Sequence, residues 1–302
     1  MSTSASKALL DTLIDDAAIF PPGNAQLPAA VEAHRRHTGS WYGSLVGAFL
    51  VSDVRLPDLT RLLEHDEAYA TTALPCTIVV SGGAGAIEPA LTWAERCDRL
   101  ALRGVEIAVR EEDDLARGVR RVSTVLDVSL PEGVDVWVEL PADGEGGSWS
   151  QAADAVAESG YRLKFRTGGE TAEAHPDPRA LAAGLTAAVD REVAFKCTAG
   201  LHHAIRNTKS GTGFERHGFL NVVLATHALL EGNGTQDVAQ LLETRDADAV
   251  VAACADIDVE TAARVRRGFT SFGSCSIDDP VGDLVELGLL HSERSDSVEA
   301  GR

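Results

Sequence analysis

The most constraining feature of this sequence is a repeated alternation of short strand-forming runs with longer helical stretches. The runs are rich in β-branched and aromatic residues, and the stretches between them in Ala, Leu, Arg and Glu. This rhythm is typical of strand–helix units around a parallel sheet. It predicts strands at residues 45–51, 77–81, 105–109, 134–140, 161–165, 193–197 and 269–272. An eighth strand is expected between residues 219 and 251, where the apolar run 219–230 fits either a strand or a helix.

Seven or eight such units in about 250 residues predict an α/β fold, a (β/α)8 TIM-like barrel. The alternative is a doubly wound open sheet, but no G-x-G-x-x-G fingerprint follows the first predicted strand. Because 77 positions separate Lys196 from Gly273, an insertion is expected before the last strand. We expect one barrel domain over residues 1–290, with an extra subdomain at about 205–268 and a flexible tail at 291–302.

The N-terminal segment is predicted to be helical over residues 4–15. Its acidic end runs into a Pro-Pro stop at residues 21–22, which predicts a plug at one end of the barrel. Neither a signal peptide nor a transit peptide fits this polar start, and no apolar run approaches the roughly 20 residues that span a bilayer. The sequence therefore predicts a cytoplasmic protein.

Charge and cysteine content exclude several classes of partner. The 302 residues carry 46 acidic and 27 basic side chains, a net charge of -19, which disfavours nucleic acid and anionic membrane surfaces. The five cysteines are odd in number and form no C-x-x-C pair, which argues against a disulfide framework and against a thiolate zinc site. The expected partner is a small anionic substrate, and the sequence leaves room for a homo-oligomer.

Two of the four lysines, Lys164 and Lys196, occupy equivalent places in consecutive predicted strands, each followed by Thr and Gly. A buried ammonium group costs several kcal/mol unless it is paired or deprotonated. One interpretation is a nucleophilic or proton-relaying lysine whose pKa is lowered by a second cation. The alternative is a snorkelling lysine, or a buried salt bridge with Glu139 or Glu106.

The residues around these lysines resemble the deoxyribose-phosphate aldolases. Residues 164–168, Lys-Phe-Arg-Thr-Gly, are similar to the motif that carries the family's Schiff-base lysine. Residues 196–201 resemble its next-strand lysine, and residues 269–274 its Gly-Thr-Ser phosphate loop. The sequence departs where the family has a proton-relay Asp, because Ala108 stands there. The resemblance implies a class I aldolase-like barrel in which Glu139 or another group relays protons.

Residues 200–217 form an unusually polar segment, and such loops after a barrel strand usually carry function. We expect Lys164, Arg166, Lys196, Arg206 and Lys209 to form a local basic site for a small anion. The predicted catalytic residues are Lys164, Lys196, Glu139 and His202. The predicted substrate-binding residues are Arg166, Thr167, Gly168, His203, Arg206, His217, Gly273 and Ser274.

The sequence thus predicts a lyase that cleaves or forms a carbon–carbon bond through a Schiff-base lysine, without a metal or another cofactor. One alternative is a metal-dependent hydrolase or isomerase that uses His202, His203 and His217. Another is a barrel that binds an anion without catalysis.

Overall fold

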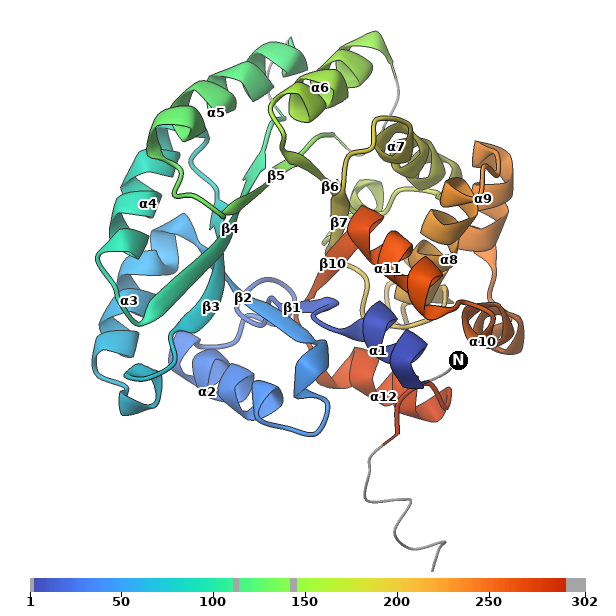
Figure 1. Ribbon diagram of the computed structural model, residues 1–302, viewed down its shortest axis with the longest axis horizontal. Coiled ribbons are helices and arrows are strands. Elements are labelled where there is room, and N and C mark those ends of the chain that lie inside the picture. Colours follow the sequence, from blue (N-terminus) through green and yellow to red (C-terminus); the bar gives the residue numbers. More distant parts are fainter. Residues whose placement is uncertain (1–2, 111–113, 142–145, 292–302) are drawn as a thin grey trace, which may run out of the picture.

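Eight parallel strands close into a barrel in the computed structural model, which describes residues 3–110, 114–141 and 146–291 (Figure 1). The order around the barrel follows the chain from β1 to β7, and β10 closes the ring between β7 and β1. The prediction of a TIM-like (β/α)8 barrel is confirmed. Residues 292–302 of the predicted tail lie outside the described residues. The barrel strands are β1 Ile14–Asp16, β2 Val46–Ser52, β3 Leu74–Val80, β4 Leu100–Ala108, β5 Asp135–Glu139, β6 Arg162–Arg166, β7 Phe195–Thr198 and β10 Phe269–Ser274.

Helices surround the barrel, and the core lies between them and the outward side chains of the strands (Figure 1). Aspartates at several helix starts, such as Asp114 and Asp177, accept hydrogen bonds from backbone N–H groups of the first turn. The helices that follow the barrel strands directly, together with the N-terminal helix, are α1 Thr3–Leu10, α2 Leu27–Thr38, α3 Leu56–Glu64, α4 Ile87–Glu95, α5 Leu115–Ser129, α6 Gly147–Glu158, α7 Pro178–Asp190 and α12 Asp278–Glu286. None of the helices in the described ranges is long and apolar enough to cross a membrane.

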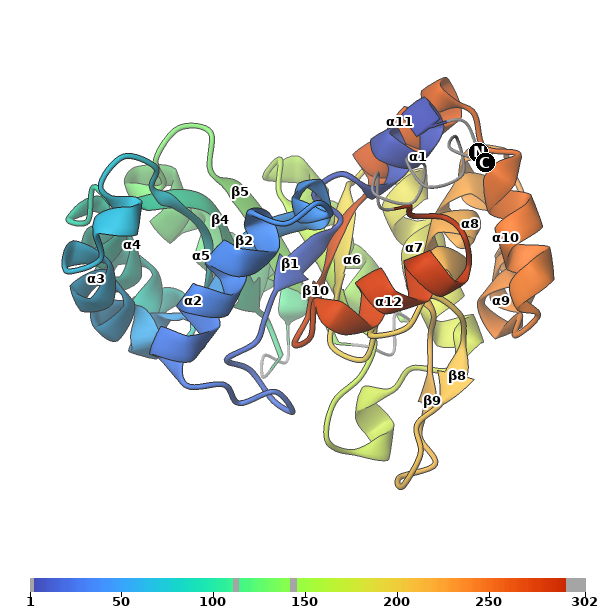
Figure 2. The same cartoon turned by 90° about the horizontal axis from the view of Figure 1, so that it is seen from below.

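The segment between β7 and β10 holds a small hairpin and four helices. The hairpin strands β8 and β9 pair in antiparallel fashion and project from one end of the barrel (Figure 2). This hairpin follows the carboxyl end of β7, the end at which TIM barrels carry their sites. The elements are β8 Asn207–Thr208, β9 Glu215–Arg216, α8 Phe219–Leu230, α9 Thr235–Glu243, α10 Ala247–Ala255 and α11 Val259–Gly268.

The first barrel strand corrects the prediction for the N-terminus. Residues 4–15 do not form one helix, because α1 ends at Leu10 and β1 begins at Ile14. All three residues of β1 are buried, and Asp15 lies in register with Gly273 of β10. The carboxylates tolerate burial because they are bonded; Asp16 Oδ2, for example, lies 3.0 Å from Nδ1 of His34. Asp15 and Asp16 are therefore part of the barrel wall, whereas Ala17 and residues 20–22 line the cavity at one end of the barrel.

The expected eighth strand between residues 219 and 251 is absent from this fully described segment. Residues 219–230 form helix α8, which is buried on almost every side. Its first residue, Phe219, stacks on Phe272 of β10 with ring centroids 5.0 Å apart. A helix enclosed by neighbours loses its polar face, so its composition matches that of a buried strand.

Gly104 of β4 lies at a close approach inside the barrel that requires glycine. A Cβ atom on Gly104 of β4 would overlap Cζ3 of Trp137 and lie 3.1 Å from Cε3. Trp137 is buried, and the Nζ of Lys196 lies 4.9 Å from the centroid of its ring. The absence of a side chain at Gly104 thus gives Trp137 its place inside the barrel.

We expect Gly104→Ala to lower the free energy of unfolding by about 1–3 kcal/mol, because an overpacked core shifts side chains and backbone. Urea-induced unfolding followed by circular dichroism measures the change. The control is Gly85→Ala, where a new Cβ meets nothing within 4 Å, and its effect is expected within about 0.5 kcal/mol. Equal stabilities of the two variants would contradict this account.

Candidate active site

Five charged side chains from five strands meet inside the barrel. Asp15 comes from β1, Glu106 from β4, Glu139 from β5, Lys164 from β6 and Lys196 from β7. Glu139 lies in register with Lys164, and Lys164 in register with Lys196. Because side chains alternate along each strand, residues in register project to the same face of the barrel wall. The sequence-predicted lysine pair and Glu139 are therefore brought together.

Lys196 is enclosed completely and held by two carboxylates. Its Nζ donates hydrogen bonds to Asp15 Oδ2 and to Glu106 Oε1, both at 2.6 Å. Burial alone would lower the pKa of Lys196, but the negative charges of Asp15 and Glu106 outweigh burial and raise it. Lys196 is therefore a fixed ammonium group, shielded from solvent.

Lys164 has a different environment, because it lines the cavity at the carboxyl end of the barrel. Its Nζ lies 2.7 Å from Glu106 Oε2 and 3.0 Å from Glu139 Oε2. These contacts are ion pairs, whereas Lys196 donates aligned hydrogen bonds to its partners. Lys164 is thus the lysine of the pair that a ligand in the cavity can reach.

The two glutamates that contact Lys164 are both strong acids in this setting. Burial would raise the pKa of Glu106, but the charges of Lys164 and Lys196 bring it down to about 2. Burial would also raise the pKa of Glu139, but the positive charges of Lys164 and Arg166 lower it to about 2. Arg166 Nε lies 2.8 Å from Glu139 Oε1, which also accepts a hydrogen bond from Arg110. Both carboxylates are therefore ionised at neutral pH.

A cavity of about 640 Å³ opens above this network. Five of the residues predicted from the sequence line it, namely Lys164, Arg166, His202, Lys209 and Gly273. Glu139 and Lys196 lie behind its wall and act through their contacts with Lys164 and Glu106. The complete wall is formed by Ala17, Phe20, Pro21, Pro22, Leu50, Val79, Glu106, Arg110, Lys164, Arg166, Gly169, Glu170, Thr171, Ala174, Thr198, Ala199, Gly200, His202, Lys209, Thr212, Phe214, Arg216, Gly273 and Cys275.

The other predicted substrate-binding residues do not line this cavity. Two of them shape the turns after β6 and β7: Thr167 Oγ1 donates to the carbonyl of Ala199 at 2.5 Å, and Gly168 packs closely on Gly200. The rest contact other protein groups. Arg206 lies 3.5 Å from Glu215, His203 3.2 Å from Asp283, His217 2.8 Å from the carbonyl of Pro176, and Ser274 2.6 Å from the carbonyl of Ser276.

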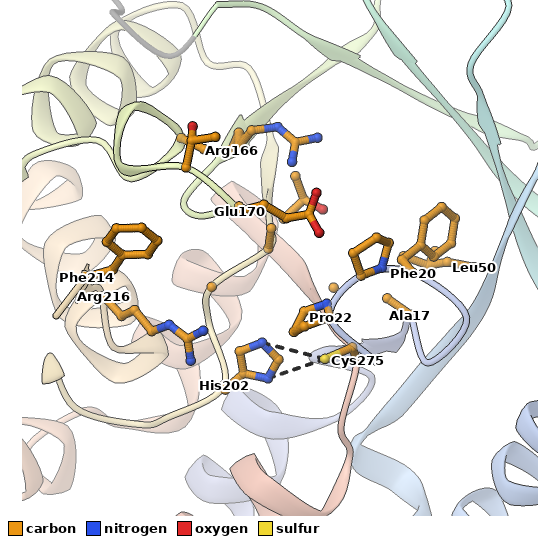
Figure 3. Close-up of a pocket in the computed structure, with 18 of the residues that line it drawn as sticks. Ala17, Phe20, Pro22, Leu50, Arg166, Glu170, His202, Phe214, Arg216 and Cys275 are labelled. Carbon is orange, nitrogen blue, oxygen red and sulfur yellow. Dashed lines mark hydrogen bonds between the residues drawn. The ribbon is translucent and has the colours of Figure 1, made fainter. Parts of the chain in front are cut away.

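His202 is buried at the cavity wall beside Cys275 (Figure 3). Its ring nitrogens lie 3.7 and 3.9 Å from Cys275 Sγ, and Nδ1 lies 3.4 Å from Ser274 Oγ. Burial, reinforced by the positive charge of Arg216, lowers the pKa of His202 to about 4. The imidazole is therefore neutral at pH 7 and can accept a proton from a ligand only weakly.

The three histidines considered for a metal site are not brought together. His202 contacts Ser274 and Cys275, whereas His203 faces Asp283 and His217 faces Pro176. Within the described ranges, no group of three or more His, Cys, Asp or Glu side chains is placed to hold a metal ion.

Sequence reasoning missed three charged residues at this site, namely Asp15, Arg216 and the cavity-lining Glu170. Asp15 was hidden because β1 is too short to show alternation, and its acidic composition favoured a helix end. Arg216 lies in the polar segment that the sequence singled out, but only the pairing of β8 with β9 shows that it lines the cavity. The hairpin register was not predictable from that segment, which is rich in glycine.

Comparison with known proteins supports the fold. Neither the protein-family models nor the curated proteins include a match to this sequence. Among solved structures, the chain is similar to deoxyribose phosphate aldolase from Aeropyrum pernix, which is described as having a unique tetrameric structure. The TM-score is 0.56 at 13% identity, over 94% of this chain and 97% of that one. The distant resemblance expected from the lysine motifs is confirmed as a likeness of fold.

Proposed function

We propose that this protein is a carbon–carbon lyase of the class I aldolase type, acting on a small anionic carbonyl compound through a Schiff base on Lys164. The observation that supports it is the position of Lys164, a cavity-lining amine within 3.0 Å of two ionised carboxylates. The aldolase-like fold places this amine at the carboxyl end of the strands, where such barrels carry their chemistry.

Carboxylates and cations of the network surround Lys164. Three carboxylates, from Asp15, Glu106 and Glu139, face the cations of Lys196, Arg110, Arg166 and Lys164. The first three cations alone already balance the three carboxylates. A carbonyl compound in the cavity therefore meets an amine whose neighbouring carboxylates are also held by other cations.

The reaction can be written with the groups present. The neutral amine of Lys164 attacks the carbonyl carbon, and the resulting carbinolamine loses water to form an iminium ion. The iminium ion accepts the electron pair of the breaking carbon–carbon bond as a base removes the proton of the β-hydroxyl group. His202 is the proposed base, because its neutral imidazole lines the cavity, and Glu139, behind the wall, positions Lys164 through their contact at 3.0 Å. Protonation of the enamine and hydrolysis then release the second product and restore Lys164.

Borohydride trapping tests this proposal directly. We expect incubation with pyruvate or glyceraldehyde 3-phosphate and then borohydride to add the reduced carbonyl compound to Lys164. Mass spectrometry assigns the site with little ambiguity, because the chain has only four lysines. Lys164→Met should abolish the adduct, whereas Lys7→Met, which changes an exposed lysine on α1, should retain it.

Turnover of a carbonyl substrate without a trapped adduct would contradict the Schiff-base mechanism. An adduct confined to another lysine would also contradict it. Self-association is a further part of the proposal, supported by the tetramer described for the similar aldolase.

A further inference from the structure

Arg216 on β9 is a buried cation without a partner. Its side chain is only 8% exposed, and its Nε is buried without a hydrogen-bond partner. No hydrogen bond or ion pair involves its guanidinium among the described residues. The side chain nevertheless lines the cavity, with its guanidinium group directed toward His202 (Figure 3). An unpaired buried charge is costly, so it is retained where a ligand supplies the countercharge.

Three other cations at the cavity contact carboxylates of the protein, whereas Lys209 lines the cavity as a half-buried side chain without an ion pair among the described residues. Lys164 contacts Glu106 and Glu139, and Arg166 and Arg110 also contact Glu139. Lys164 and Arg166 were expected from the sequence to attract an anion, but both already contact carboxylates of the protein.

The same contrast holds within the hairpin. Arg206 lies 3.5 Å from Glu215 and does not line the cavity. Asp279 is the one carboxylate whose charge acts on Arg216, and it forms no ion pair with it among the described residues. Arg216 is therefore the hairpin guanidinium that remains available to a ligand.

The opposite wall of the cavity is apolar. Ala17, Phe20 and Pro22 follow β1, Leu50 belongs to β2, and in Figure 3 they lie across the cavity from Arg216. Such side chains offer no hydrogen bonds to sugar hydroxyl groups, but they gain from covering apolar surface. The cavity thus has a cationic side and an apolar side, and the carboxylate of Glu170 lies between them (Figure 3).

We propose that Arg216 binds the phosphate, phosphonate or carboxylate group of an amphipathic substrate, whose apolar part packs against Phe20, Pro22 and Leu50. A guanidinium group suits this role because it forms paired hydrogen bonds with such oxyanions. The inference rests on the proposed function for the carbonyl at Lys164 and names the class of substrate. The anion site itself is testable without any reaction.

Calorimetric titration with two phosphonates tests the contributions of the cationic side and the apolar side of the cavity to binding separately. Phenylphosphonate is expected to bind the wild type at least tenfold more tightly than methylphosphonate. Arg216→Gln should weaken the binding of both at least tenfold. The control Arg179→Gln removes an exposed guanidinium in the first turn of α7, outside the cavity wall, and should leave both affinities within twofold.

Unchanged phenylphosphonate binding in a folded Arg216→Gln variant would overturn the anion site, as would the absence of binding to the wild type. Equal affinities for the two phosphonates would overturn the apolar side. If Arg216→Gln does not fold, Arg216→Lys is measured in its place. Lysine keeps the positive charge but lacks the paired donors of the guanidinium group. Undiminished phenylphosphonate binding by Arg216→Lys would then overturn the proposal. Lys164→Met is expected to bind phenylphosphonate, so failure of the Schiff-base mechanism and failure of this inference are distinguishable.

Discussion

Replacing Glu106 by Gln is expected to lower the free energy of unfolding by about 3–5 kcal/mol, because it leaves buried charge without its partner. Glu106 is fully buried and contacts both lysines of the barrel interior, Lys196 at 2.6 Å and Lys164 at 2.7 Å. Gln keeps the shape of the side chain and removes its charge. Equilibrium unfolding in urea at pH 7 measures the loss.

Two further variants show whether charge is the cause. Glu215→Gln removes an exposed carboxylate that pairs with Arg206 and Arg245, and its effect is expected within about 1 kcal/mol. The double variant Glu106→Gln/Lys164→Met removes a buried charge of each sign and leaves Asp15 paired with Lys196 and Glu139 paired with Arg166, so it should be more stable than Glu106→Gln alone. A loss below about 1 kcal/mol in Glu106→Gln would contradict the account of a network held by its charges.

The stabilising effect of Glu106 and Glu139 is expected to disappear in acid. Both carboxyl groups have a pKa of about 2 in the folded protein, against an ordinary value of 4.5. The unfolded chain therefore takes up these protons first as the pH falls. The stabilisation is complete above about pH 4.5 and is lost progressively toward pH 2.

The difference in unfolding free energy between the wild type and Glu106→Gln measures the effect of Glu106 alone, because the surface carboxylates contribute equally to both proteins. The gap in unfolding free energy should be constant between pH 7 and 5 and narrow as the pH falls from about 4.5 toward 2. Urea titrations at a series of pH values give this gap. A gap that widens in acid, or that closes already above pH 5, would rule out a lowered pKa at Glu106.

Much of the barrel was predictable, because its strands are buried on both faces. Residues 45–51 and 161–165 were expected as strands, and β2 and β6 cover 46–52 and 162–166. The errors have a physical cause. β1 is three residues long and carries two acidic side chains, whose burial depends on distant partners such as Lys196. Helix α8 is enclosed on almost every side, so its apolar run has no period to distinguish it from a strand.

The candidate site was predictable in its lysines but not in its balance of charge. Lys164 and Lys196 were identified because a lysine inside an apolar strand is unusual, and a salt bridge with Glu106 or Glu139 was considered for them. The structure shows both contacts for Lys164. Which arginine stays unpaired depends on the register of the hairpin, so the sequence favoured Arg206 where the structure exposes Arg216 to the cavity.

The location of Arg216 on the hairpin has a consequence for how this protein could change during evolution. The amine and its carboxylates are fixed to the barrel strands, whereas Arg216 lies on a two-stranded hairpin with no ladder to them. Mutations in the hairpin can therefore alter which ligand is held while the reactive amine keeps its surroundings. Descendants of one barrel could diverge in substrate preference and still inherit the same bond-breaking machinery.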